Sequence, residues 1–458
     1  MKKNGLFIAI GMIAICVIGW LTISSQVVKE KSQYSRYIKE ADAWVEKGLY
    51  QRAISNYNLA LEDKKNEKLY EKVNAAYSLR FKEEPEETIA DYMDFLEIAI
   101  EEYPYNHKLV NSFAKIYSIQ GKYEEVYECL KNAVENGYNT DKIQSKLREA
   151  RYAFKLKGND FSGIKQSSEE FYVTARNEEW NIYSLDEGYM LLKKYKYMSP
   201  ANKDGIVVAT AKDSRIVDST GMVYGIFKKK VTEAGILAED LVAARIDGVY
   251  SYYNDLAEKQ FGEYEMAGTF QNGKAAVKDD KNWVLVNKKG KEVSKKFEEI
   301  VLDYLGNYLA DDLMLAKDKG TYGIYDKDEK LLCKLDCDDV DILTSDKLIA
   351  VSKNGKWGFV NEEGKKIVDF VYEEAKSFSC GLAAIKKDGK WGFIDPKGNV
   401  VIECQFSDAG YMSENGICPV RTDFPEEEVD KTDNKKSKKV EIMETWKMLQ
   451  LEIGIQEE

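Results

Sequence analysis

The chain has 458 residues, a formal net charge of −12, 32% charged residues and 44% hydrophobic residues. This length and balance predict two or three folded domains and argue against global disorder. The acidic charge argues against nucleic-acid binding, and the single histidine, His107, argues against histidine-based metal sites and catalytic relays, so we expect no metal, cofactor or catalytic residue.

The first 28 residues have the pattern of a membrane anchor. Lys2 and Lys3 precede an uncharged, mostly apolar run over residues 6–23, which is close to the shortest length that spans a bilayer as a helix. We therefore expect residues 1–28 to form a cytoplasmic start and a single transmembrane signal anchor, with the remaining domains outside the cell membrane. The alternative is a signal peptide that is cleaved near Ser24.

From residue 33 to about residue 160, apolar residues recur at helical spacing. Two stretches in this range share a glycine and a tyrosine at a turn between helices, and they resemble the tetratricopeptide repeat. The residues that carry the resemblance are Trp44, Gly48, Tyr50, Ala53, Gly121 and Tyr123. The resemblance implies an α-helical solenoid of hairpins over 33–160, in which these residues pack helix on helix and the concave surface holds peptides or proteins.

The second half of the chain repeats itself. Residues 356–364 and 390–398 are nearly identical at an offset of 34 residues, and both begin with Lys-Trp-Gly-Phe. Weaker copies in the same register include Trp180, Ser214 and Tyr250, so that the whole series indicates about seven units. The clearest signature positions are Trp283, Tyr322, Gly323, Trp357, Gly358, Gly364, Trp391, Gly392 and Gly398.

Each unit has the pattern of a β-meander. An alternating strand leads to Asp388-Gly389, a two-residue turn that matches the twist of paired strands. The Trp-Gly-Phe strand follows, and a second turn runs from Asp395 to Gly398. A third apolar strand at 400–402 completes the unit.

The repeat resembles the WG (KWG) repeat family, bacterial proteins known mainly as tandem β-repeats without an assigned reaction. The resemblance covers roughly residues 170–421 and implies a non-catalytic β-repeat domain over 170–456 with a charged loop at 422–440. The alternation at Leu449 and Leu451 predicts a strand of a final, partial unit. We expect a propeller-like ring of about seven small blades, because closure leaves no exposed sheet edge. The alternative is an open β-solenoid.

Two recurring side-chain types have both a structural and a functional interpretation. Asp339 aligns with an acidic residue in other units, which favours a turn or cap over a metal site. Trp357 and Trp391 recur once per unit, which favours packing between sheets, whereas exposed rings would favour sugar binding.

The helical repeats and the β-repeats both indicate that function lies on the surfaces that the repeats form. We expect a membrane-anchored, non-catalytic scaffold that binds other proteins or peptides. The alternative is a cell-envelope carbohydrate-binding module that takes cell-wall glycans. An enzyme would require carboxylates that converge from different blades.

Overall fold

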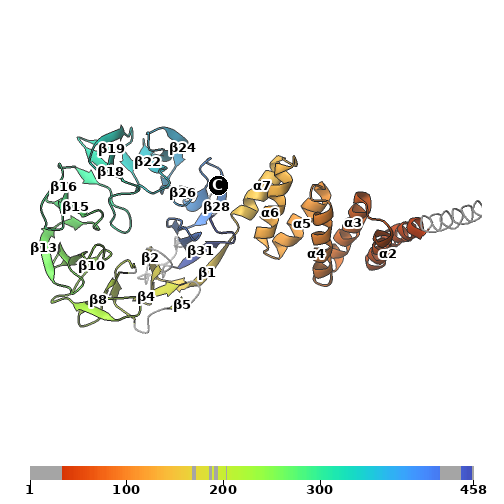
Figure 1. Ribbon diagram of the computed structural model, residues 1–458, viewed down its shortest axis with the longest axis horizontal. Helices are drawn as coiled ribbons and strands as arrows, with labels where there is room; N and C mark the ends of the chain where they lie inside the picture. The colour runs from red at the N-terminus through yellow and green to blue at the C-terminus, as the bar shows by residue number, and fades with distance from the viewer. Residues whose placement is uncertain are drawn as a thin grey trace, which may run out of the picture. The chain divides into compact units, whose positions relative to one another are not determined.

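The computed structural model describes residues 33–167, 172–184, 188–189, 194–202, 204–422 and 445–455 (Figure 1). The chain divides into two compact units between Ala153 and Phe154. The described residues of the first unit form helices and those of the second form strands, and each unit has buried hydrophobic clusters of its own. The β-domain thus begins earlier than residue 170, where the repeat register placed its start.

The first unit consists of helices that contact one another in chain order. Residues 33–46 are helical, and α2 to α7 follow at Tyr50–Asp63, Glu67–Glu83, Pro85–Glu102, His107–Ile119, Tyr123–Glu135 and Asp141–Arg151. Local sequence sets several helix starts. The Asn106 side chain accepts hydrogen bonds from the backbone N–H groups of Lys108 and Leu109 and caps α5. Pro85 begins α4, where a backbone N–H has no helical partner to lose.

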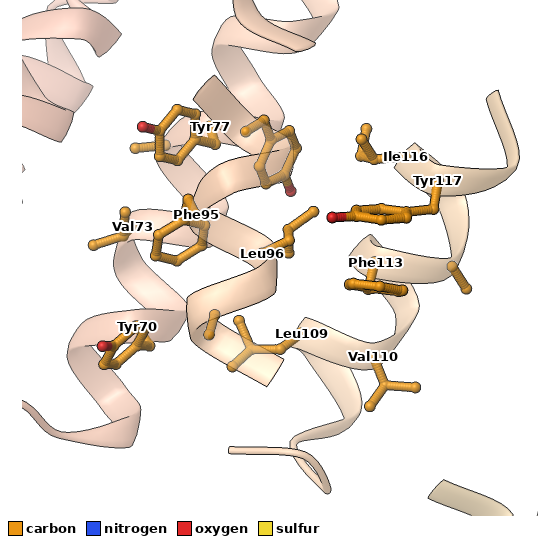
Figure 2. Packing of buried hydrophobic residues seen from close by; sticks show 14 of the residues in the cluster. Tyr70, Val73, Tyr77, Phe95, Leu96, Leu109, Val110, Phe113, Ile116 and Tyr117 are labelled. Carbon is orange, nitrogen blue, oxygen red and sulfur yellow. The ribbon is translucent and has the colours of Figure 1, made fainter. Parts of the chain in front are cut away.

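Aromatic rings fill the core between α3, α4 and α5 (Figure 2). The rings of Tyr70 and Tyr77 stack on Phe95 with centroids 5.8 and 5.2 Å away. Phe113 and Tyr117 of α5 stack at 3.8 Å. Because such a pair contributes about 0.5–1.5 kcal/mol beyond the area it buries, the contacts of Tyr70 and Tyr77 with Phe95 help to hold α3 against α4.

The second unit is a ring of eight small antiparallel sheets, counted over the described residues (Figure 1). We call these sheets blades 1 to 8. Blades 1 to 3 contain β2 to β5 (Gly163–Lys165, Tyr172–Arg176, Glu179–Ser184, Gly188–Tyr189), β6 to β9 (Tyr197–Met198, Ile206–Ala209, Ser214–Val217, Val223–Ile226) and β10 to β13 (Glu233–Ala234, Val242–Ile246, Val249–Tyr253, Lys259–Tyr264). Blades 4 and 5 contain β14 to β16 (Met266–Ala267, Lys274–Asp279, Asn282–Asn287) and β17 to β20 (Glu299–Ile300, Leu313–Asp318, Thr321–Asp326, Leu331–Lys334).

Blades 6 and 7 contain β21 to β24 (Asp339–Val340, Ile349–Lys353, Lys356–Val360, Lys366–Tyr372) and β25 to β28 (Glu374–Ala375, Ala383–Lys387, Lys390–Ile394, Val400–Phe406). Blade 8 contains β29 (Asp408–Ala409), β30 (Ile417–Arg421), β31 (Trp446–Leu451) and β1 (Phe154–Phe161). The short first strand, which is β29 in blade 8, lies at one edge of its sheet, and in blade 3 this strand, β10, lies nearer the ring centre than β13 (Figure 1).

Turn chemistry fixes the hairpins inside a blade. Asp388 and Gly389 have φ angles of 52° and 73°, which is the backbone of a two-residue turn that follows strand twist. In the next turn, the Asp395 side chain accepts hydrogen bonds from the backbone N–H groups of Lys397 and Asn399 at 3.0 and 2.8 Å. The structure confirms the meander that the sequence predicts for this unit.

Blade 8 closes the ring with strands from both ends of the β-domain. β31 pairs with β30 on one side and with β1 on the other, with Phe154 opposite Leu451. The Gln166 side chain of blade 1 also bonds both backbone polar groups of Tyr411 in blade 8, through its amide oxygen at 2.9 Å and its amide nitrogen at 2.7 Å. These contacts make the domain a closed propeller rather than an open solenoid.

The prediction of seven blades is wrong, because the structure has eight. The final, partial unit of the sequence is a full blade whose outer strand, β1, comes from a segment assigned to the helical region. Its middle strands are also interrupted by residues 423–444, which lie outside the described residues. A search for a 34-residue register therefore does not detect this blade.

The membrane-spanning helix expected over residues 6–23 also lies outside the described part of the chain. Among the helices that the structure does describe, none combines the length and the apolar composition that crossing a bilayer requires. This finding does not support the expectation of a single-pass membrane protein with extracellular domains.

Candidate binding surfaces

The signature aromatic residues lie near the start of the third strand of their blades. Trp283, Tyr322 and Trp391 are only 8%, 5% and 4% exposed, and Trp357 is half-buried. The three buried rings, Trp283, Tyr322 and Trp391, fill space within the propeller and leave no open face on which a sugar could stack.

Several signature rings complete a three-residue ladder across a blade. In blade 5, Glu299 of β17, Lys317 of β18 and Tyr322 of β19 lie side by side in register. The Tyr322 hydroxyl donates a 2.7 Å hydrogen bond to the Glu299 carboxylate, and the Lys317 ammonium lies 4.7 Å from the centre of the ring. Blade 3 repeats the ladder with Glu233, Arg245 and Tyr250. The recurring acid, which is Asp339 in blade 6, therefore lies in the innermost strand and not in a turn or cap.

The signature glycines lie where the backbone passes close to a neighbouring strand or adopts a positive φ angle. A Cβ atom at Gly392 would lie 2.6 Å from a backbone oxygen of β28, and one at Gly358 would lie 2.9 Å from the backbone of β24. Gly364 and Gly398 have φ angles of 74° and 81°, which favour glycine. These glycines allow the third and fourth strands of a blade to approach each other closely and to turn.

The signature residues of the helical unit are structural as well. Gly48 and Gly121 have φ angles of 70° and 69° in the turns that precede α2 and α6, and Ala53 is fully buried. Trp44 is half-buried, with two side-chain cations 4.9 and 5.1 Å from its ring. Tyr50 and Tyr123 are the first residues of α2 and α6.

A recess of about 490 Å³ lies among α2, α3 and α4, away from these signature residues. Its floor contains the stacked rings of Tyr70, Tyr77 and Phe95 (Figure 2). Leu61 of α2 and Ile98 of α4 also line the recess, and Ile98 is 51% exposed. The recess thus combines a rigid aromatic floor with an open aliphatic edge.

The charge of this recess is mainly negative. The carboxylates of Glu62, Asp91 and Asp94 line it, together with the single ammonium group of Lys65. Lys65 already forms an ion pair with Glu102 at the surface. Since the lining has three carboxylates and one ammonium, it favours a ligand that is both apolar and cationic.

No three His, Cys, Asp or Glu side chains among the described residues are grouped in a way that could hold a metal ion. Two acidic positions of the inner strands, Glu233 and Glu374, are instead engaged within their own blades. Arg245 lies 3.3 Å from Glu233, and Lys386 lies 2.7 Å from Glu374.

Four segments of the β-domain, residues 261–283, 322–357, 357–391 and 391–423, match the family model of the WG containing repeat. These segments are WG containing repeats. No curated protein matches the sequence of the chain.

The boundaries of the WG containing repeats do not coincide with the blades. The segment 322–357 starts in the third strand of blade 5 and ends in the third strand of blade 6, and 357–391 joins blades 6 and 7 in the same way. Each of these repeats therefore contributes to two adjacent blades, which ties neighbouring sheets together covalently.

Solved β-rich structures show a distant likeness. Hsv2 of Kluyveromyces lactis has 10% sequence identity and a TM-score of 0.35, over 59% of this chain and 96% of that one. The β-propeller domain of Cps50 (Swd1) from Myceliophteria thermophila has 11% identity and a TM-score of 0.30, over 58% of this chain and 95% of that one. We draw nothing about function from these similarities.

Proposed function

We propose that this protein is a non-catalytic interaction scaffold that holds peptide segments of other proteins in the recess among α2, α3 and α4. The observation that carries the proposal is the aromatic floor beneath a rim of carboxylates. A tetratricopeptide-like stack of hairpins is suited to peptide binding on its repeat surface, and a WG-repeat propeller is suited to a scaffold.

The recess specifies the chemistry of the peptide. Stacked rings and the exposed Ile98 edge favour an aliphatic or aromatic side chain as the buried anchor. The carboxylates of Asp91 and Asp94 favour lysine or arginine beside that anchor. We therefore expect a basic peptide with one or two apolar anchors.

Selection from a random peptide library displayed on phage, with the full-length protein as bait, tests this proposal. The selected peptides should be enriched in apolar residues flanked by Lys or Arg. Replacing Glu62, Asp91 and Asp94 by Gln, Asn and Asn should weaken their binding by about 1–2 kcal/mol, because each exposed charge pair contributes up to about 1 kcal/mol. Added salt should reduce the affinity of the parent more than that of the variant.

A matched variant controls for net charge. Glu124, Glu128 and Glu135 are exposed acids of α6, outside the recess, and their replacement by Gln removes the same charge. This variant should bind the selected peptides like the parent. Equal weakening by the two triple variants, or selection of acidic peptides, would contradict the proposal.

A further inference from the structure

At one position at or just after the end of the first strand of a blade, blade 6 has a carboxylate where two other blades have a lysine. In blade 7, Lys376 lies two residues after Glu374, the acid of the ladder. In blade 1, Lys165 occupies the equivalent position. Each ammonium donates to a backbone oxygen of the next blade and lies over the signature tryptophan of its own blade, at 4.7 and 5.4 Å. In blade 6 the equivalent residue is Asp341, so a carboxylate replaces the bridging cation.

Asp341 is bonded to residues of two other blades. Its carboxylate accepts a 2.6 Å hydrogen bond from the backbone N–H of Ser377 in blade 7. The hydroxyl of Tyr411 in blade 8 lies 2.8 and 2.9 Å from its two oxygens. Burial raises the pKa of Asp341, and burial together with that carboxylate raises the pKa of Tyr411. The phenol therefore stays protonated and donates to the carboxylate.

Tyr304 reaches the same place from blade 5. Its ring stacks on Tyr411 with centroids 5.4 Å apart. Because blades 5 and 8 are not neighbours, this contact lies toward the centre of the ring. The loop that carries Tyr304 is held firmly, since Thr269 of blade 4 bonds the backbone oxygens of Leu305 and Gly306 at 2.6 and 2.7 Å.

The Tyr304 ring is both crowded and accessible. Burial raises its pKa to about 12, yet 42% of the residue is exposed to solvent. The partly exposed Tyr304 ring thus stacks on a tyrosine whose hydroxyl is bonded to the Asp341 carboxylate. The nearest lysine, Lys376, lies 5.6 Å from the Tyr411 ring, but its ammonium is engaged by Asp408 at 3.6 Å and by the backbone of blade 8.

We propose that the cluster of Tyr304, Tyr411 and Asp341 binds a primary ammonium group, which comes from a free alkylamine or from a lysine side chain of a partner. A carboxylate accepts hydrogen bonds from such a group, and the face of an aromatic ring attracts its charge. The residues that form the site are non-repeating members of a repeating domain. This inference concerns the propeller and does not depend on peptide binding by the helical unit.

Titration of the full-length protein, labelled with ¹³C on its tyrosine rings, with n-butylammonium and with a short lysine-containing peptide tests the proposal by NMR. One or both should shift the ring signals of Tyr304 and Tyr411, which are assigned with Tyr304→Phe and Tyr411→Phe. Butanol and the Nε-acetyllysine peptide should shift neither. A response to butylammonium alone identifies a free amine as the ligand, and a response to the peptide alone identifies a partner lysine.

Two variants, each with a matched control variant, separate binding from folding. Asp341→Asn should weaken ammonium binding by about tenfold or more, because it removes the charged acceptor, while Asp336→Asn, at an exposed acid of the same blade, should have no effect. Tyr304→Ala, at an exposed residue, should weaken binding by about threefold, and Tyr304→Phe should retain it. Equal binding of parent and Asp341→Asn, equal shifts with butanol, or no shift with either amine would overturn the proposal.

Discussion

Phe161→Ala probes the junction at which the two ends of the β-domain meet. Phe161 is the last residue of β1, is fully buried, and packs in one cluster with Tyr172, Ile417 and Met448. It also makes an edge-to-face contact with Tyr183 at 5.0 Å. Because Phe161→Ala removes a fully buried ring and its contact with Tyr183, we expect it to lower the free energy of unfolding by about 3–5 kcal/mol.

Urea unfolding followed by tryptophan fluorescence measures this loss, because five of the seven tryptophans lie in residues 154–458. Val371→Ala serves as the control: this residue is 59% exposed on the outer strand β24, and its replacement should change the free energy of unfolding by about 0.5 kcal/mol or less. A loss below about 1 kcal/mol for Phe161→Ala would refute the packing of β1 against blades 1 and 8.

Further predictions concern the repeat core, the C-terminal strand and pH. Trp391→Ala should cost about 3–5 kcal/mol in the same urea assay, because the ring is buried, and an unchanged midpoint would contradict this. Deletion of residues 440–458 removes β31 and should lower the melting temperature and promote aggregation, because it leaves β1 without a partner strand and exposes one edge of β30. Deletion of 424–438, between β30 and β31, should be nearly neutral in calorimetry, because the number of residues that connect two strands costs little entropy; equal melting of the two deletion variants would disprove the strand's role. Burial lowers the pKa of Lys165 from 10.5 to about 8, so between these pH values the unfolded chain binds more protons and stability from this group rises with pH. Between pH 8 and pH 10, the free energy of unfolding of Lys165→Met should therefore rise less than that of the parent. An equal rise in the two proteins would contradict the lowered pKa of Lys165.

The hairpins of the repeats were predictable because their causes are local. The Asp388-Gly389 turn depends on two adjacent residues that adopt positive φ, and the Asp395 turn depends on hydrogen bonds within five residues. Such chemistry is visible in the sequence without knowledge of distant contacts.

The eighth blade was not predictable in this way. β1 and β31 lie at opposite ends of the β-domain, and their pairing depends on ring closure. The role of the recurring acids was missed for a related reason. The contact between Glu299 and Tyr322 joins the first and third strands of a blade, and sequence alignment shows only that both residues recur.

The two candidate sites differ in how much of each the sequence could have indicated. Tyr70 and Tyr77 are seven residues apart, so they share a helix face, and this spacing is the signal that could have marked the recess. Asp341 stands where two other blades have lysine, but its meeting with Tyr304 and Tyr411 is set by tertiary structure alone.

Engineered disulfide formation between β1 and β31 tests the closed eight-blade ring most directly. Lys155 lies opposite Gln450 in the register of these strands, so a variant with cysteine at both positions should cross-link under mild oxidation, as detected by mass spectrometry of the digested protein. Cysteines at Lys155 and Lys447 are the control, because a shift of three residues along β31 adds about 10 Å, beyond disulfide reach. Cross-linking of the first pair and not of the second is the predicted result. Failure of the first pair to cross-link, or equal cross-linking of both, would contradict the closed ring.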